Sequence, residues 1–326
     1  MPQFNKAPYQ TKSAVLFLIF NRPDTTEKVF EQIRIAKPGR LYIAADAPRA
    51  NVHGEALQCE LAKQVVQNVD WECEVKTLYK EKNAGCKLGV SSAITWFFDH
   101  EEEGIILEDD CLPANGFFRF CDTLLEKYRD DTRIRHITGC NLQQGKKWGN
   151  GSYYFSNRTH VWGWASWKRA WKDYDVNLNN YDSEGIRERL LNIYQDPLVV
   201  ECWVNIFKEL KTGNNSSWAY PLDFINFFNN GLTIIPNENL ISNIGFDSNA
   251  THTIEKDSVF ASVPLVEIEE IVHPSFILPE KQADLFIMNN HFNIAERRRK
   301  QNRLRKRAKR WFKSIVKHAA AFMFLS

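Results

Sequence analysis

The chain has 326 residues, of which 44% are apolar and 13% aromatic, so it is globular and long enough for one large α/β domain or two modest ones. Its seven cysteines are widely scattered and contain no CxxC pair, which argues against a disulfide framework and a zinc cluster and favours a reducing compartment. The net charge of +2 is unevenly distributed, because residues 297–317 contain twelve Lys or Arg and no acid. Removing these twelve from the 42 basic residues leaves 30 against 40 acidic ones, so the rest of the chain carries about −10.

The first predicted element is a buried strand at 14–20. It is too short to span a bilayer and is followed by Asn-Arg-Pro rather than by a small-residue cleavage site, so we expect neither a signal peptide nor a transmembrane anchor. Strands and helices then alternate, with strands at 40–45, 72–79 and 104–107 and helices at 25–35, 55–66 and 89–100. This alternation with short loops predicts a mainly parallel sheet with helices on both faces.

The second half of the chain is less regular. We expect helices at 115–128, 186–211 and 222–229, extended segments at 135–139 and 232–236, and little regular structure in the Gly- and Trp-rich stretch 145–174. A basic helical stretch begins near residue 296 and ends in bulky apolar residues. The chain shows no internal repeat, so one elaborated domain followed by a basic tail fits best.

The acidic triplet Glu108-Asp109-Asp110 directly follows the apolar run 104–107. Three neighbouring carboxylates at the end of a buried strand repel one another and are costly to desolvate, so each raises the pKa of the others. A divalent cation would remove this cost. Mg²⁺ and Mn²⁺ suit such oxygen ligands and are usually held by one or two protein carboxylates, with phosphate and water completing the shell. A solvated acidic turn is the alternative, since the acids 101–103 lie just upstream.

The order of these features resembles the GT-A fold, the Rossmann-like fold of nucleotide-sugar glycosyltransferases. The closest likeness is to the Golgi N-acetylglucosaminyltransferase I family and its bacterial relatives, in which an EDD sequence closes a strand after similar alternation; here the sequence is IILEDDCLPANGFFRF. The resemblance implies that Asp110 binds Mn²⁺ or Mg²⁺ and that Glu108 and Asp109 face the sugar and ribose of the donor. It also implies a donor half at about 14–112 and an acceptor half at about 113–290, followed by the tail at 291–326.

Three positions upstream of the triplet resemble donor-binding residues of the same family. Arg22, in the first strand-to-helix turn, matches an arginine that reaches the donor phosphates, and a surface arginine is its alternative. Asp46, at the end of the second strand, matches an aspartate that recognises uracil, and a helix-cap or turn aspartate is its alternative. Asn83 lies in an Asn-Ala-Gly turn similar to one that approaches the donor, although such loop glycines are common.

Three positions downstream complete the predicted site. Trp164, within VWGWASWKRAW, matches an aromatic loop under the donor sugar, although its four tryptophans fit a core equally well. Asp223, within SWAYPLDFINFF, matches the catalytic aspartate and is the predicted general base, with an N-cap aspartate opening a helix at Phe224 as the alternative. His252 is a possible phosphate or metal contact, or else a surface loop histidine.

The resemblance implies a metal-dependent hexosyl- or N-acetylhexosaminyltransferase that moves a sugar from a UDP-sugar to an acceptor hydroxyl with inversion. Two alternatives remain: an inert binding module of the same fold, and a nucleotidyltransferase that makes nucleotide sugars. The nucleotidyltransferase is disfavoured because the turn Phe20-Asn-Arg-Pro-Asp24 lacks the glycines of an activating loop. The inert module is disfavoured because the candidate base and metal ligand are both present.

The basic tail suggests where the reaction takes place. Arg and Lys residues followed by bulky apolar side chains and Trp311 match a helix that lies on an anionic membrane surface. We therefore expect a peripheral protein on the inner face of a bacterial cytoplasmic membrane, acting on a lipid-linked saccharide in cell-surface glycan or lipopolysaccharide assembly. Nucleic-acid binding and a disordered, solvated tail are the two alternatives.

Overall fold

The computed structural model describes residues 7–182, 185–246 and 263–323. Within these ranges the centre of the fold is an eight-stranded sheet of order β3-β2-β1-β4-β8-β6-β9-β7. Its strands are β1 Ala14–Ile19, β2 Arg40–Ala45, β3 Glu74–Tyr79, β4 Glu103–Glu108, β6 Ile134–Thr138, β7 Tyr153–Ser156, β8 Trp164–Trp167 and β9 Leu232–Pro236. β7 and β8 run antiparallel to the other six strands, so the predicted mainly parallel sheet is confirmed.

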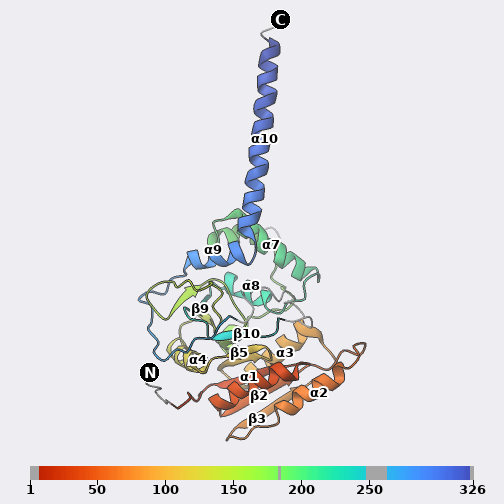
Figure 1. The fold of residues 1–326 in the computed structure, drawn as a ribbon, viewed down its shortest axis with the longest axis vertical. Coiled ribbons are helices and arrows are strands. Elements are labelled where there is room, and N and C mark those ends of the chain that lie inside the picture. The colour runs from red at the N-terminus through yellow and green to blue at the C-terminus, as the bar shows by residue number, and fades with distance from the viewer. Residues whose placement is uncertain (1–6, 183–184, 247–262, 324–326) are drawn as a thin grey trace.

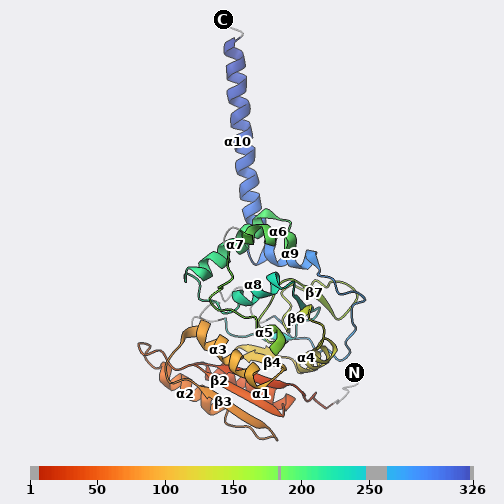
Figure 2. The same ribbon diagram turned by 180° about the vertical axis from the view of Figure 1, so that it is seen from behind.

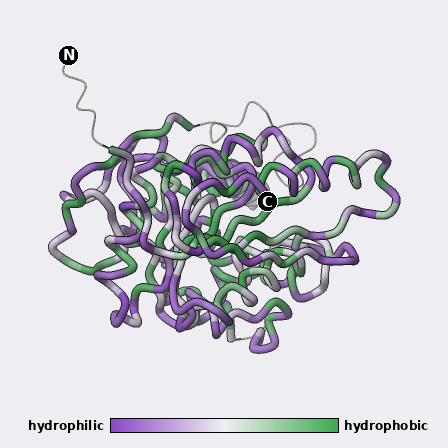
Figure 3. Tube along the Cα trace, turned by 90° about the horizontal axis from the view of Figure 1, so that it is seen from below, coloured by the Kyte–Doolittle hydropathy of each residue, from purple (hydrophilic) through white to green (hydrophobic). Residues whose placement is uncertain are grey.

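Helices cover both faces of this sheet, as predicted, which makes the protein an α/β fold (Figure 1). Alternate residues of β1 face opposite layers. Val15 and Phe17 pack with α1 (Pro23–Ala36) and α4 (Asn115–Lys127), whereas Leu16 and Leu18 pack with α3 (Gly85–His100), α7 (Pro197–Lys211) and α8 (Tyr220–Phe228). Hydrophobic segments run through the interior of the body (Figure 3). The helices are α1 Pro23–Ala36, α2 Glu55–Val65, α3 Gly85–His100, α4 Asn115–Lys127, α5 Lys168–Trp171, α6 Gly185–Ile193, α7 Pro197–Lys211, α8 Tyr220–Phe228, α9 Lys281–Asn290 and α10 Ile294–Met323.

The second half differs from the sequence prediction in two places. The single helix expected at 186–211 is interrupted, because Asp196 caps a new helix by accepting a hydrogen bond from the Leu198 N–H at 3.0 Å, with Pro197 as its first residue. The stretch 145–174 was expected to be irregular but contains β7, β8 and α5. β7 and β8 are only four residues long and buried throughout, so they lack the polar alternation that marks a strand in sequence.

A small antiparallel pair links the end of β4 to a distant part of the chain. β5 (Cys111–Pro113) follows the acidic triplet and pairs with β10 (Ile241–Asn243), so that Cys111 lies opposite Asn243. The Ile244 N–H then donates to the Asp110 carbonyl at 2.8 Å. This pairing holds residues 243–245 beside the triplet, although about 130 residues of chain separate them.

The C-terminal helix α10 leaves the body and projects away from it (Figures 1 and 2). Ile294 at its root is fully buried, whereas residues 301–309 are all exposed. The predicted basic C-terminal helix is therefore present. In the described part of the chain, no helix combines the length and the apolar character needed to cross a membrane.

Candidate functional site

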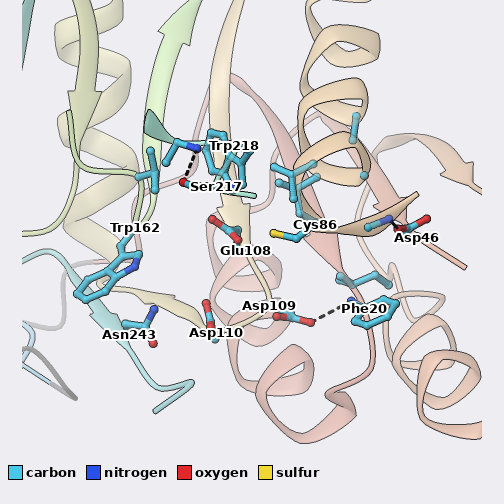
Figure 4. Close-up of a pocket in the computed structure, with 18 of the residues that line it drawn as sticks. Phe20, Asp46, Cys86, Glu108, Asp109, Asp110, Trp162, Ser217, Trp218 and Asn243 are labelled. Atoms are coloured by element: carbon cyan, nitrogen blue, oxygen red, sulfur yellow. Dashed lines mark hydrogen bonds between the residues drawn. The ribbon is translucent and has the colours of Figure 1, made fainter. Parts of the chain in front are cut away.

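A cavity of about 600 Å³ lies at the carboxyl ends of β1, β2 and β4. Side chains from the segments that follow these strands line one side of it, and residues from the second half of the chain line the rest (Figure 4). The predicted site residues that the cavity brings together are Arg22, Asp46, Asn83, Glu108, Asp109, Asp110 and Asp223. Ligand sites of parallel α/β sheets form at this edge, because the loops of neighbouring strands converge there.

The acidic triplet is held at this edge by contacts with the turn after β1. Asp109 Oδ2 accepts a hydrogen bond from the Phe20 N–H at 3.0 Å, and Arg22 Nη1 lies 3.4 Å from Asp110 Oδ2. Desolvation and, after it, the neighbouring Asp110 carboxylate together raise the pKa of Asp109 to about 7, against the opposing effect of the Phe20 N–H. The pKa of Glu108 is also raised, first by desolvation and then by Asp110 and Asp109. The cavity therefore favours an added cation.

The chemistry of these residues fits a divalent metal ion held by few protein ligands. Across the described ranges, no group of three or more His, Cys, Asp or Glu side chains is arranged to hold a metal by itself. The triplet instead offers hard carboxylate oxygens inside a cavity with room for a phosphate group, which is how Mg²⁺ is commonly bound. Asp110 is the predicted ligand, and the second candidate, His252, lies outside the described residues.

Asp46 and Asn83 join two loops at the cavity wall. Asp46 Oδ2 accepts a hydrogen bond from the Gly85 N–H at 2.9 Å, and the Ala84 N–H donates to the same carboxylate at 3.0 Å. Asn83 Nδ2 donates to the Ala47 carbonyl at 2.6 Å. Asp46 thus binds the N–H groups of Ala84, the N-cap residue of α3, and of Gly85, its first residue, which agrees with the helix-cap or turn alternative. Recognition of a nucleobase by Asp46 and donor contact by Asn83 stay predictions.

Gly245 is a site residue that the sequence interpretation missed. Arg22 Nη1 donates to its carbonyl at 3.3 Å, and a Cβ on Gly245 would lie 2.6 Å from Arg22 Nη1 and 2.7 Å from Asp110 Cβ. Only glycine allows the chain to pass this close to the Arg22–Asp110 pair. The β5–β10 pairing that places Gly245 here is non-local, so no sequence pattern marks this glycine.

Asp223 lines the cavity and is only 2% exposed. Its Oδ1 accepts hydrogen bonds from Arg158 Nη1 at 2.9 Å and from the Thr159 N–H at 3.0 Å. Burial raises the pKa of Asp223, while Arg158 opposes that shift. The N-cap alternative is wrong, because α8 begins at Tyr220 and Asp223 already lies inside its first turn.

Arg158 is a second site residue that the sequence interpretation missed. It lines the same cavity and is 4% exposed, and its guanidinium lies over the rings of Trp203 at 4.3 Å and Phe292 at 5.0 Å. Because aromatic faces attract a cation, these two rings and the Asp223 carboxylate together stabilise the buried charge of Arg158. Its partners come from distant segments, which is why spacing in the sequence gave no signal for it.

Trp164 does not occupy the place predicted for it. Its side chain is fully buried on β8 and stacks on the His136 ring, with centroids 4.9 Å apart. A strand between β4 and β6 directs this residue into the core, beside α3 and α8. The core alternative is therefore correct for Trp164, and the cavity is instead lined by Trp162 and Trp218.

No protein-family model matches the chain, and neither does any curated protein. The mannosyltransferase PcManGT from Pyrobaculum calidifontis, determined with GDP-Man and Mn²⁺, is similar at 12% identity over 70% of this chain and 72% of that one, with a TM-score of 0.35. Mouse xyloside xylosyltransferase 1 is similar at 12% identity over 67% of this chain and 80% of that one, with a TM-score of 0.33. HddC from Yersinia pseudotuberculosis is similar at 10% identity over 50% of this chain and 80% of that one, with a TM-score of 0.31. The sheet topology and the helices on both faces establish the α/β fold class of this chain.

Proposed function

We propose that the protein is a GT-A glycosyltransferase that moves a sugar from a UDP-sugar to an acceptor hydroxyl. The observation that carries this proposal is that one cavity contains both the acidic triplet after β4 and the buried Asp223 of α8. Inverting sugar transfer needs a group that stabilises the departing diphosphate and a base that takes the proton of the acceptor. The lining of this cavity supplies residue types suited to each task.

On the donor side, the chain binds and orients the nucleotide sugar. Arg22 supplies a positive charge near the diphosphate, and Glu108 and Asp109 accept hydrogen bonds from donor hydroxyl groups. Asp110, alone or with a neighbouring carboxylate, would hold Mn²⁺ or Mg²⁺. Such an ion, when bound, neutralises charge on the leaving diphosphate. Asp46 keeps the start of α3 against the nucleobase end of the cavity.

On the acceptor side, Asp223 is the general base. Arg158 and the Thr159 N–H fix its Oδ1. Because burial raises the pKa of Asp223, its basicity exceeds that of an exposed aspartate. The carboxylate takes the proton of the acceptor hydroxyl as the oxygen bonds to the anomeric carbon and the carbon–diphosphate bond breaks. Attack from the face opposite the diphosphate inverts the configuration.

The transferred group and the acceptor are assigned from the same resemblance. We propose a hexosyl- or N-acetylhexosaminyl group as the cargo and a saccharide of a cell-surface glycan, such as lipopolysaccharide, as the acceptor. Trp162 and Trp218 line the cavity and offer flat faces on which sugar C–H groups pack.

Release of UDP from a panel of UDP-sugars, measured with a mixture of saccharide acceptors, tests the proposal. We expect release that depends on Mn²⁺ or Mg²⁺ and falls by at least about a hundredfold in Asp110→Asn. Glu27→Gln is the matched control, because Glu27 is an exposed carboxylate of α1. Equal activity of folded Asp110→Asn and wild type would contradict the assigned role. Formation of a UDP-sugar from UTP and a sugar phosphate would favour the nucleotidyltransferase.

A further inference from the structure

The long helix α10 is joined to the body at its root. Ile294 is fully buried, and Arg298 forms an ion pair with Asp196, the N-cap residue of α7. Beyond this root, residues 301–309 are exposed, and the helix extends away from the body (Figure 2). A helix of 30 residues is about 45 Å long, so most of α10 has no part in the folded core.

The exposed part of α10 has an apolar stripe within a strongly basic sequence. Leu304, Ala308 and Trp311 follow one another at spacings of four and three, which places them along one line of the helix. Leu304 is 64% exposed and Trp311 is 62% exposed, so these large apolar side chains are not covered by the core. The sequence continues the same spacing with Ile315 and Ala319.

The charge of this helix contrasts with that of the body. Twelve Lys or Arg and no acid occur in residues 297–317, whereas the rest of the chain has an excess of acidic residues. A surface that attracts α10 through charge therefore has to be anionic. Because an apolar stripe accompanies the charge, that surface also has to accept apolar side chains. An anionic lipid interface meets both conditions.

We propose that α10 lies on an anionic lipid surface, with Leu304 and Trp311 inserted at the interface and the basic residues facing the lipid phosphates. Nucleic acid offers the charge but no layer that takes up an apolar stripe. A second copy of the helix offers the stripe but adds twelve further positive charges to the assembly. The lipid surface is thus the partner that both properties favour.

This docking brings the lipid surface to the helix that is joined to the cavity wall. His291 and Phe292, which connect α9 to α10, line the cavity that contains Asp223. The Phe292 ring also lies under the Arg158 guanidinium at 5.0 Å. The lipid-bound helix is therefore joined to the cavity wall by a connection of three residues, 291–293. Docking would hold the cavity close to molecules that are anchored in the same lipid surface.

Flotation of the full-length protein with phosphatidylglycerol/phosphatidylcholine vesicles tests the charge requirement. We expect wild type to float with these vesicles and not with pure phosphatidylcholine vesicles. The double variant Arg305→Glu/Arg307→Glu should lose on the order of a hundredfold in vesicle affinity. Lys12→Glu/Lys28→Glu is the matched control, because it reverses two exposed charges on the body and should float like wild type.

A second pair of variants tests the apolar requirement. Leu304→Gln/Trp311→Gln should also reduce flotation, whereas Leu57→Gln, at an equally exposed leucine of α2, should not. Equal binding to neutral vesicles, no flotation of wild type, or flotation of the tail variants like wild type would each overturn the proposal. Tight binding of duplex DNA without vesicle binding would overturn it in favour of nucleic acid. A dimer that disappears in Leu304→Gln/Trp311→Gln, again without vesicle binding, would overturn it in favour of a second copy.

Discussion

Arg158 and Asp223 form a buried ion pair, in which Arg158 Nη1 lies 2.9 Å from Asp223 Oδ1. The two residues are 4% and 2% exposed, so neither charge is compensated by bulk water. Removing one partner leaves the other charge buried and unpaired, which costs more than the pair itself contributes. The proposed base is thus also part of the structural core, and its two roles have to be separated by experiment.

A double variant separates the structural role of Asp223 from its role as the base. Asp223→Asn should lower the free energy of unfolding by about 3 kcal/mol, because it leaves Arg158 unpaired. Arg158→Met/Asp223→Asn should regain most of that stability in urea unfolding, since it removes both charges. Sugar transfer should remain lost in the double variant, because an amide cannot take the acceptor proton. A stable and active double variant would exclude Asp223 as the base.

The close approach of Gly245 to the Arg22–Asp110 pair gives a second prediction. In Gly245→Ala, the new methyl group would displace Arg22 or Asp110, so we expect at least about a tenfold loss of kcat/KM and a loss of about 1–3 kcal/mol in stability. Gly39→Ala is the control, because no atom lies within 4 Å of a Cβ at that position. Unchanged kinetics in Gly245→Ala would show that the geometry of this pair is irrelevant to turnover.

Trp162 and Trp164 should respond to substitution in opposite ways. Trp164→Ala removes a fully buried indole and should cost about 3–5 kcal/mol of stability, measured by chemical denaturation. Trp162→Ala affects a residue that lines the cavity and should instead raise KM or lower kcat with a small change in stability. If Trp162→Ala proves kinetically silent, this part of the cavity wall does not contact either substrate.

His136 should make the protein sensitive to acid. Burial lowers the pKa of His136 from 6.5 to about 4, while the hydrogen bond with the His160 carbonyl acts in the opposite direction. Because the unfolded chain takes up a proton first, stability falls as the pH decreases from 6.5 to about 4, by about 3 kcal/mol. His136→Gln cannot take up this proton. Chemical unfolding measured between pH 6.5 and about 4 should therefore show that wild type loses about 3 kcal/mol of stability relative to the variant. Parallel pH profiles would contradict a neutral buried His136.

Local patterns predicted the first part of the fold, about residues 14–112, well. β1 and β4 contain continuous apolar runs, which predict buried strands, and the triplet could be placed at a strand end because it directly follows the run 104–107. The Asp223 carboxylate was predicted from the resemblance, and the fold brings it to the same cavity.

The parts that sequence could not predict depend on non-local contacts. β7 and β8 are short and buried on both faces, so no alternation distinguishes them from a loop. Arg158 and Gly245 acquire their roles from partners 65 and more than 130 residues away. Trp164 was misplaced for a similar reason, because only the position of β8 between β4 and β6 decides which of the neighbouring tryptophans enters the core.

Calorimetric titration of UDP into the protein, with and without Mn²⁺, tests the central claim most directly, because it measures binding at the triplet without requiring the acceptor. Wild type should bind UDP with Mn²⁺ and lose at least about tenfold in affinity when the ion is removed. Asp110→Asn should bind UDP weakly with or without Mn²⁺, and Glu27→Gln, at an exposed carboxylate of α1, should behave like wild type. Binding of UDP to Asp110→Asn with the full affinity and Mn²⁺ dependence of wild type would contradict the claim that Asp110 anchors the donor diphosphate.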